Sequence, residues 1–212
     1  MNKNNKEINC FTIGHSTYES EAFVKLLRSN SIEQLVDVRS VPYSQYNPQY
    51  NKENIKVFLE NSGISYVFMG NLLGARYNNP ELFFPDKEIV DFNEVRKTNE
   101  FKRGIEIVID GLKEGHKTCL MCSEKDPFEC HRFVLVSYAL AKQGISVKHI
   151  LENGDIISNE ALEERLLSKY KIEYGNLTLF DSCKSKEAAI EEGYEKRNRD
   201  IGYVKVDAAS IS

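Results

Sequence analysis

The sequence predicts an α/β fold, an open and mostly parallel sheet of about five strands with helices on both faces, followed by a C-terminal helical elaboration. Three observations predict it. Short apolar runs alternate with amphipathic helical patterns from residue 8 to residue 151. The run 32–38 is rich in apolar residues, with Leu35 and Val36 adjacent, as expected of a parallel strand buried on both faces. Beyond residue 151 the alternation stops, and two charged helical stretches follow.

We expect two parts in the chain. Residues 8–151 form the α/β domain, and residues 152–212 form a helical extension packed on the same domain. The predicted strands are 8–13, 32–38, 64–69, 117–122 and 146–151. The predicted helices begin at a capping box of Ser16 and Glu19, at Lys52, at an Asp86 cap, at Thr98 (ending at Leu112), at Asp126 (ending at Gly144), at Asn159 and at Lys184.

Composition limits the class of protein. The chain has 212 residues and a formal net charge of −4, so no overall basic field recruits nucleic acid. Its five cysteines are an odd number, and no apolar run reaches membrane length. These features predict a reduced, cytoplasmic protein rather than a disulfide scaffold or a membrane protein. The sequence identifies no cofactor and leaves the oligomeric state open.

The stretch 117–144 is the most informative one. It predicts a buried strand, a short polar loop and a helix whose start is marked by Asp126 as N-cap, Pro127 at the first helical position and Glu129 completing a capping box. Such a strand-loop-helix turn directs free backbone N–H groups and the positive end of the helix dipole at whatever lies above the sheet. The site therefore suits an anion.

Thiols and their neighbours in this stretch have several interpretations. Cys119 and Cys122 form a CxxC pair, but side chains alternate along a strand, so the pair cannot hold one metal ion. Cys122, where strand meets loop, is either a thiolate of lowered pKa near a helix N-terminus or an inert buried cysteine. Cys130, His131 and Arg132 are consecutive, and on a helix they would fan out by about 100° each, so they cannot all face one point.

Other polar residues follow the remaining strands. Asp37 and Arg39 face the same side and suit an ion pair or a pair that orients a substrate. The loop after Arg39 is long and mixes aromatic, proline and amide residues, the composition of a binding loop. In open α/β sheets ligands bind outside the carboxyl ends of the strands. The candidate residues in those strand-end loops are His15, Arg39, Ser44, Arg76, Cys122 and Glu124.

Three functional hypotheses follow. In the first, the protein is an enzyme for a small anionic or nucleotide-like substrate and uses no metal. Its groups would be Cys122 as nucleophile, His15 or Glu124 as general acid/base, and Arg39, Arg76, Arg132, Ser44 and Tyr46 as substrate contacts. The second hypothesis is a nucleic-acid-binding accessory module that stacks bases on Tyr43, Tyr46, Tyr50 and Tyr77, although the acidic charge counts against it. The third is a metal site assembled from His15, Cys122, Cys130 or His131.

Five ordered motifs give the chain a resemblance to a known family. They are residues 13–16 (IGHS), 37–42 (DVRSVP), 46–52 (YNPQYNK), 73–76 (LGAR) and the run from Cys122-Ser123-Glu124 to Cys130-His131-Arg132. With the Leu179-Phe180-Asp181 tail, they resemble the DUF488 family of bacterial and archaeal proteins, which lacks an established activity. The resemblance implies an α/β fold and a shared pocket. The chain departs from the family at Tyr43 and Gln45, where arginines are usual, and at Ala75, where glycine is usual.

Overall fold

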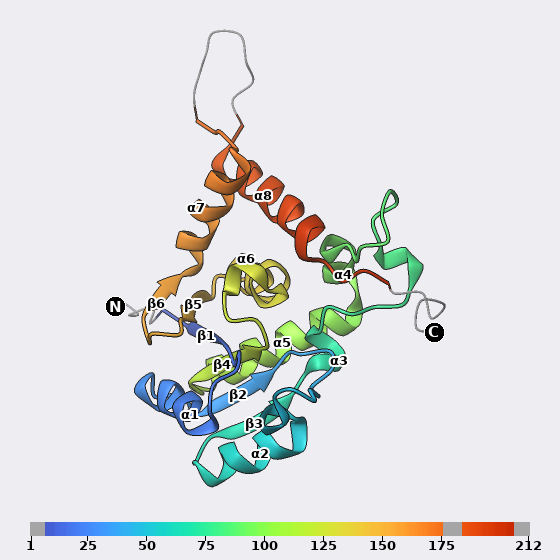
Figure 1. Ribbon diagram of the computed structural model, residues 1–212. Helices are drawn as coiled ribbons and strands as arrows, with labels where there is room; N and C mark the ends of the chain where they lie inside the picture. Colours follow the sequence, from blue (N-terminus) through green and yellow to red (C-terminus); the bar gives the residue numbers. More distant parts are fainter. Residues whose placement is uncertain (1–6, 176–183, 206–212) are drawn as a thin grey trace.

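The computed structural model describes residues 7–175 and 184–205 and shows an open six-stranded sheet (Figure 1). The strands are β1 (Asn9–Gly14), β2 (Gln34–Asp37), β3 (Ser65–Phe68), β4 (Thr118–Cys122), β5 (Ser146–Ile150) and β6 (Ile156–Ser158). Their order is β3-β2-β4-β1-β5-β6; the first five strands are parallel, and only β6 pairs antiparallel, with β5. The predicted fold class is confirmed. The sixth strand was not predicted, because three residues carry too little pattern.

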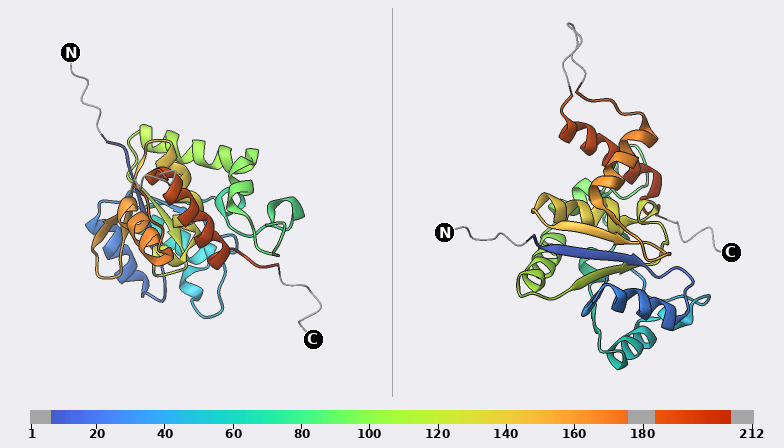
Figure 2. Two further views of the ribbon diagram at one scale, coloured as in Figure 1. Left: turned by 90° about the horizontal axis from the view of Figure 1, so that it is seen from above. Right: turned by 90° about the vertical axis from the view of Figure 1, so that its left-hand side faces the viewer.

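Helices cover both faces of the sheet (Figure 2). On one face, α1 (Ser20–Ser29) and α2 (Lys52–Asn61) pack apolar side chains such as Leu27 and Ile55 onto the strands. On the other face lie α5 (Asn99–Lys113) and α6 (Tyr138–Lys142). Cys119 belongs to the first cluster and Cys122 to the second, so the two cysteines do point to opposite faces.

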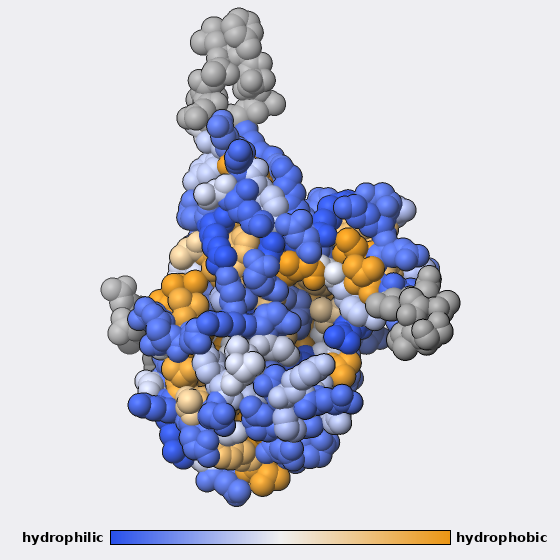
Figure 3. All heavy atoms as spheres, viewed as in Figure 1, coloured by the Kyte–Doolittle hydropathy of each residue, from blue (hydrophilic) through white to orange (hydrophobic). Residues whose placement is uncertain are grey.

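The C-terminal helices pack on the second face. Helix α7 (Asn159–Tyr170) has the predicted bounds, and α8 (Lys186–Ile201) runs beside it toward α4 (Phe92–Lys97) (Figure 1). The Asn198 side chain donates to the carbonyl of Val90 at 2.8 Å and accepts from the N–H of Phe92 at 2.7 Å. The surface of α7 and α8 toward the viewer is mostly hydrophilic (Figure 3). No helix of the described ranges is long and apolar enough to cross a membrane.

Two predicted helix starts are wrong. Ser16 has a left-handed backbone (φ 47°), so α1 begins only at Ser20 and no Ser16–Glu19 capping box forms. Asp86 caps no helix; its carboxylate pairs with Arg199, and α4 begins after Asp91, whose Oδ1 accepts from the N–H of Asn93 at 2.8 Å. Short turns complete the chain: η1 (Pro48–Tyr50), α3 (Gly70–Leu73), η2 (Pro80–Leu82) and η3 (Pro127–Glu129).

The predicted single helix from Asp126 to Gly144 is interrupted. Asp126 caps only the short turn η3, and Cys130 is extended (φ −132°, ψ 142°). The chain then winds again through η4 (Arg132–Ser137), a wider helix, into α6. The expected capping box fails because the Glu129 carboxylate pairs with Arg197 of α8 instead of turning back to residue 126.

Candidate functional site

A small cavity lies at the carboxyl ends of the neighbouring strands β2 and β4. Its volume is about 210 Å³. The walls come from four separate segments: residues 39–41, residues 75 and 76, residues 122–124 with 129–131, and Ile201 at the end of α8 with Tyr203 just beyond it. The cavity therefore occupies the place where ligands bind in open α/β sheets. One of its walls comes from the C-terminal extension.

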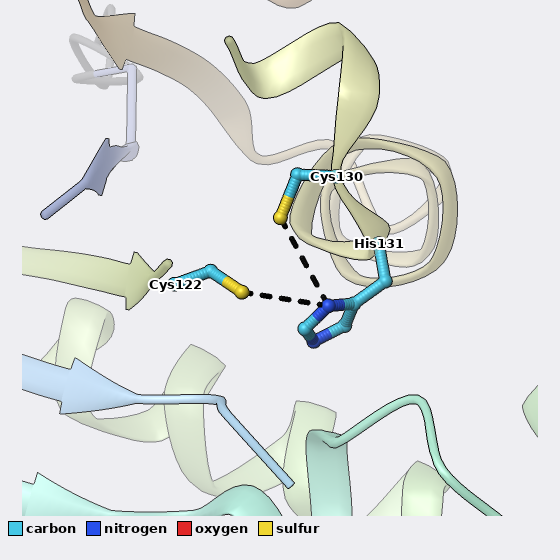
Figure 4. Close-up of side chains that lie close together, drawn as sticks. All are labelled: Cys122, Cys130 and His131. Carbon is cyan, nitrogen blue, oxygen red and sulfur yellow. Dashed lines mark hydrogen bonds between the residues drawn. The ribbon is translucent and has the colours of Figure 1, made fainter. Parts of the chain in front are cut away.

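Two thiols and an imidazole converge at this cavity (Figure 4). The Sγ atoms of Cys122 and Cys130 lie 3.6 Å and 3.9 Å from Nδ1 of His131. Both sulfur atoms also lie 3.3 Å from Oε2 of Glu124. Four chemically reactive side chains thus meet at one point. Cys122 ends β4, Glu124 lies in the loop after it, and Cys130 and His131 directly precede η4.

The extended backbone at Cys130 makes this convergence possible. On a continuous helix, Cys130 and His131 would point about 100° apart. Because Cys130 is extended and His131 is helical, both side chains turn toward Cys122. The prediction that Cys130, His131 and Arg132 cannot all face one point is confirmed, because Arg132 does not line the cavity. The helix assumed for that prediction is absent at Cys130, which is why two of the three residues do share the site.

The His131 ring is oriented by a backbone contact. Its Nε2–H donates to the carbonyl of Val38, just beyond β2, at 3.1 Å. Nδ1 therefore faces the two thiols. Burial favours the neutral ring, but the hydrogen bond to Cys130 and the nearby acidic groups raise the pKa of His131 above its usual value. The contact with Val38 fixes the direction of the ring.

The two thiols have opposite pKa shifts. The hydrogen bond to Cys130, followed by burial, raises the pKa of Cys122 well above its usual value. Burial also favours the neutral form of Cys130, but the hydrogen bond from Cys122 and the nearby charges of Arg132 and His131 hold the pKa of Cys130 well below its usual value. Of the two thiols, Cys130 is thus the one that deprotonates more readily. Of the two interpretations of Cys122, the raised pKa favours the buried cysteine over the thiolate.

Of the other two acid/base candidates, Glu124 lines the cavity and His15 does not. Burial raises the pKa of Glu124, whose carboxylate touches both thiols at the cavity. His15 does not line the cavity: its ring stacks on Tyr50 with centroids 4.0 Å apart, and Nε2 accepts from Nη1 of Arg39 at 3.1 Å. Burial, with the charge of Arg39, lowers the pKa of His15 to about 4, so this imidazole is neutral at pH 7.

Arg39 is held rigidly at the cavity wall. Its Nε and Nη2 groups donate to both carboxylate oxygens of Asp37, and Nη2 also donates to the carbonyl of Tyr50. With the Nη1 contact to His15, four of its five N–H groups are engaged. The fifth, on Nη1, has no partner among the described residues. The predicted Asp37–Arg39 pair therefore exists and keeps one donor for a ligand.

Arg132 has a different position from the other arginines. Its guanidinium is fully buried and donates to the carbonyls of Glu124 at 2.6 Å and Lys125 at 3.1 Å, behind the cavity wall. The same loop crosses the end of β1, where a Cβ on Gly14 would lie only 1.9 Å from the Glu124 carbonyl oxygen. Arg132 thus holds the loop that carries Glu124 and does not line the cavity.

The loop residues lie apart from the cluster, except for Arg76. Arg76 lines the cavity, and its guanidinium lies over the Tyr203 ring at 5.2 Å. Ser44 accepts hydrogen bonds from the N–H groups of Tyr46 and Asn47 within its own loop, and neither Ser44 nor Tyr46 lines the cavity. Tyr46 is 93% exposed, whereas Tyr50 is completely buried and offers no face to a base. Tyr77 packs against the core.

The first hypothesis did not assign Cys130 or His131 to the site. The signal that would have placed them is the C-x7-CH spacing from Cys122, combined with a break in the helix, and only the structure shows that break.

Comparison with known proteins adds one relationship. The family described as "Domain of unknown function DUF488" matches residues 19–139. This segment contains the thiol cluster, Arg39 and Arg76, but neither His15 nor the wall at residues 201–203. The tail motif at 179–181 lies outside the described residues. Nothing matches this chain among curated proteins or among solved structures.

Proposed function

The chain belongs to the DUF488 family, and from that premise we propose that it is an enzyme acting on a small anionic molecule in the strand-end cavity. One observation carries the proposal. The thiols of Cys122 and Cys130, the His131 imidazole and the Glu124 carboxylate meet at the cavity, beside Arg39 and Arg76. Reactive groups with shifted pKa values in a cleft are typical of catalytic sites.

The charges around the cavity support an anionic substrate. Arg76 is exposed at the wall and pairs with no carboxylate among the described residues. Arg39 is largely neutralised by Asp37, yet its remaining Nη1–H is available to an oxygen atom. Two acidic residues also line the cavity: Glu129 is already paired with Arg197, and burial raises the pKa of Glu124, which favours its neutral form. Arg76 and the remaining Nη1–H group of Arg39 are thus available to an anionic ligand.

The size of the cavity limits the substrate. At about 210 Å³ it is smaller than the roughly 300–1,000 Å³ typical of drug-sized ligands. A phosphorylated or carboxylated fragment fits this volume, and a larger molecule would extend past Arg76 into solvent. Glu124 is the group we assign to proton transfer, because burial raises its pKa and its carboxylate faces the cavity.

Thermal unfolding against a panel of anions tests the proposal. A ligand present at 100 times its Kd stabilises the folded chain by about 2.7 kcal/mol, which raises the Tm of a chain of this length by about 5 to 10 °C. We expect such a shift with one class among inorganic phosphate, sulfate, nucleotides and small carboxylates.

Two arginine variants locate the binding site. Arg76→Ala is expected to abolish the shift, and Arg103→Ala, which removes an exposed charge on α5 away from the cavity, is expected to keep it. Equal shifts in both variants would place the anion elsewhere. The absence of any shift across the panel would count against an anionic substrate.

A further inference from the structure

We infer that Cys122, Cys130 and His131 form a zinc site whose fourth coordination position opens into the cavity. This inference deepens the proposed function, because it names what makes the cavity reactive. The three ligand atoms, two Sγ and one Nδ1, all lie within 4.8 Å of one another. Around tetrahedral zinc, bond lengths of about 2.3 Å to sulfur and 2.0–2.1 Å to nitrogen place neighbouring ligand atoms about 3.5–3.8 Å apart. The observed S···N distances are 3.6 and 3.9 Å.

The surroundings of His131 match those of a metal-bound histidine. Such histidines donate their second ring N–H to a carboxylate or a backbone carbonyl, which fixes the tautomer. Here the N–H on Nε2 donates to the Val38 carbonyl at 3.1 Å, so Nδ1, which faces both sulfur atoms, is the nitrogen left for a metal ion. The backbone N–H of Arg132 points at Sγ of Cys130 at 3.5 Å, a contact that stabilises a thiolate ligand.

The local charge also favours a cation. Two thiolates and the Glu124 carboxylate would place three negative groups around one point, with Cys122 and Cys130 both almost fully buried. Desolvated like charges are costly unless a cation compensates them. Binding of a divalent ion displaces the thiol protons and removes that cost. The donor set of two sulfurs and one imidazole is the kind that zinc prefers.

Glu124 is assigned beside the metal rather than on it. Three protein ligands with an open fourth position are the arrangement of catalytic zinc. The carboxylate, 3.3 Å from both sulfur atoms, is then placed to accept a proton from a water molecule in the fourth position.

Metal analysis of the purified, untagged full chain is the test. After exposure to Zn²⁺ and removal of free metal, we expect about one zinc per chain. Cys122→Ser, Cys130→Ser and His131→Ala are each expected to weaken zinc binding at least about 100-fold, since even outer-shell changes cost 10- to 100-fold. Glu124→Gln, which removes no ligand, is expected to weaken zinc binding less than any of these three substitutions.

Cys119→Ser is the matched control, because Cys119 is a buried cysteine of the same strand that faces the other side of the sheet. It should bind zinc as the unmodified chain does. Failure of the unmodified chain to bind zinc, or equal loss in Cys119→Ser and Cys122→Ser, would overturn the inference.

Cobalt substitution keeps the test independent of the folding of the variants. Co²⁺ in the unmodified chain should show a thiolate-to-cobalt charge-transfer band and the intense visible bands of a tetrahedral site. Weak octahedral bands without charge transfer would contradict thiolate ligation. Neither readout requires an anion to bind, so zinc binding without an anion shift would leave this inference standing and refute the proposed substrate. A Tm shift with an anion but no zinc binding would support the anionic substrate and refute the zinc site.

Discussion

Replacing His149 is predicted to flatten the dependence of stability on pH. His149 of β5 is completely buried; its Nδ1 accepts from the Thr12 hydroxyl at 2.8 Å, and its Nε2–H faces the Asn159 side-chain oxygen at 3.4 Å. Burial, together with the charge of Arg132, lowers its pKa from 6.5 to about 3. The imidazole is therefore neutral in the folded chain and protonates more readily in the unfolded one.

The sign and size of the change in the free energy of unfolding with pH follow from this difference in pKa. Above pH 6.5 neither state binds the proton, and the stability is at its full value. As pH falls from 6.5 toward about 3, only the unfolded chain takes up the proton, so the free energy of unfolding drops by about 1.4 kcal/mol per pH unit. Between pH 7.5 and pH 5, His149 thus accounts for a loss of about 2 kcal/mol.

Urea unfolding of the unmodified chain and of His149→Asn at both pH values measures this loss. His15, with a pKa of about 4, and the carboxyl groups with raised pKa values affect the pH dependence of both chains equally. The difference between the two chains therefore isolates His149. We expect the drop in stability on going to pH 5 to be about 2 kcal/mol smaller in His149→Asn.

Thr12→Val is the matched control for this pair of buried groups. It removes the same hydrogen bond but keeps the imidazole, so it should lower stability at both pH values and retain the steep pH dependence. If His149→Asn loses as much stability as the unmodified chain, to within about 0.5 kcal/mol, then the buried imidazole is not held neutral and the reasoning fails.

Three further predictions concern close packing and buried hydrogen bonds. Gly14→Ala should lower stability by about 3 kcal/mol or more, because the new Cβ would meet the backbone of Glu124 at 1.9 Å, and an unchanged Tm would refute the close crossing. Within α5, Gly104→Ala should destabilise the chain by about 1–2 kcal/mol, since its Cβ would lie 2.7 Å from a leucine of α3. Gly111→Ala in the same helix should stabilise it by about 0.5–1 kcal/mol through helix propensity. Changes of the same sign in the free energy of urea unfolding of the two variants would contradict this prediction. Asn198→Ala should cost about 2–4 kcal/mol by leaving a buried N–H and carbonyl near α4 unpaired, and a loss under about 1 kcal/mol would show that α8 is not tied there.

The fold could be predicted because the strong signals are local. The run 32–38 has apolar residues at Ile32, Leu35, Val36 and Val38, and helices such as 52–61 and 159–170 carry both their face and their ends in adjacent residues. Where a local signal misled, a distant partner was responsible. Glu129 completes a capping box in sequence but pairs with Arg197 in space, and this long-range pair accompanies the helix break at Cys130.

The site was only partly predictable for the same reason. The rule that parallel strand ends meet at one edge placed Arg39, Arg76, Cys122 and Glu124 around one cavity. Ser44 and Tyr46 were also expected as substrate contacts, but neither lines the cavity, because both belong to a loop whose hydrogen bonds are internal. The wall at residues 201–203 had no local signal, since it depends on how α8 docks.

That wall has a consequence for the order of events during synthesis. The ribosome adds about 5 to 20 residues per second, so Ile201 and Tyr203 follow Cys122 by on the order of 4 to 16 s. During this interval the growing chain already carries both thiols and the imidazole, but one side of their enclosure has not yet been made. The cavity therefore reaches its final shape only when the end of the C-terminal helix has docked.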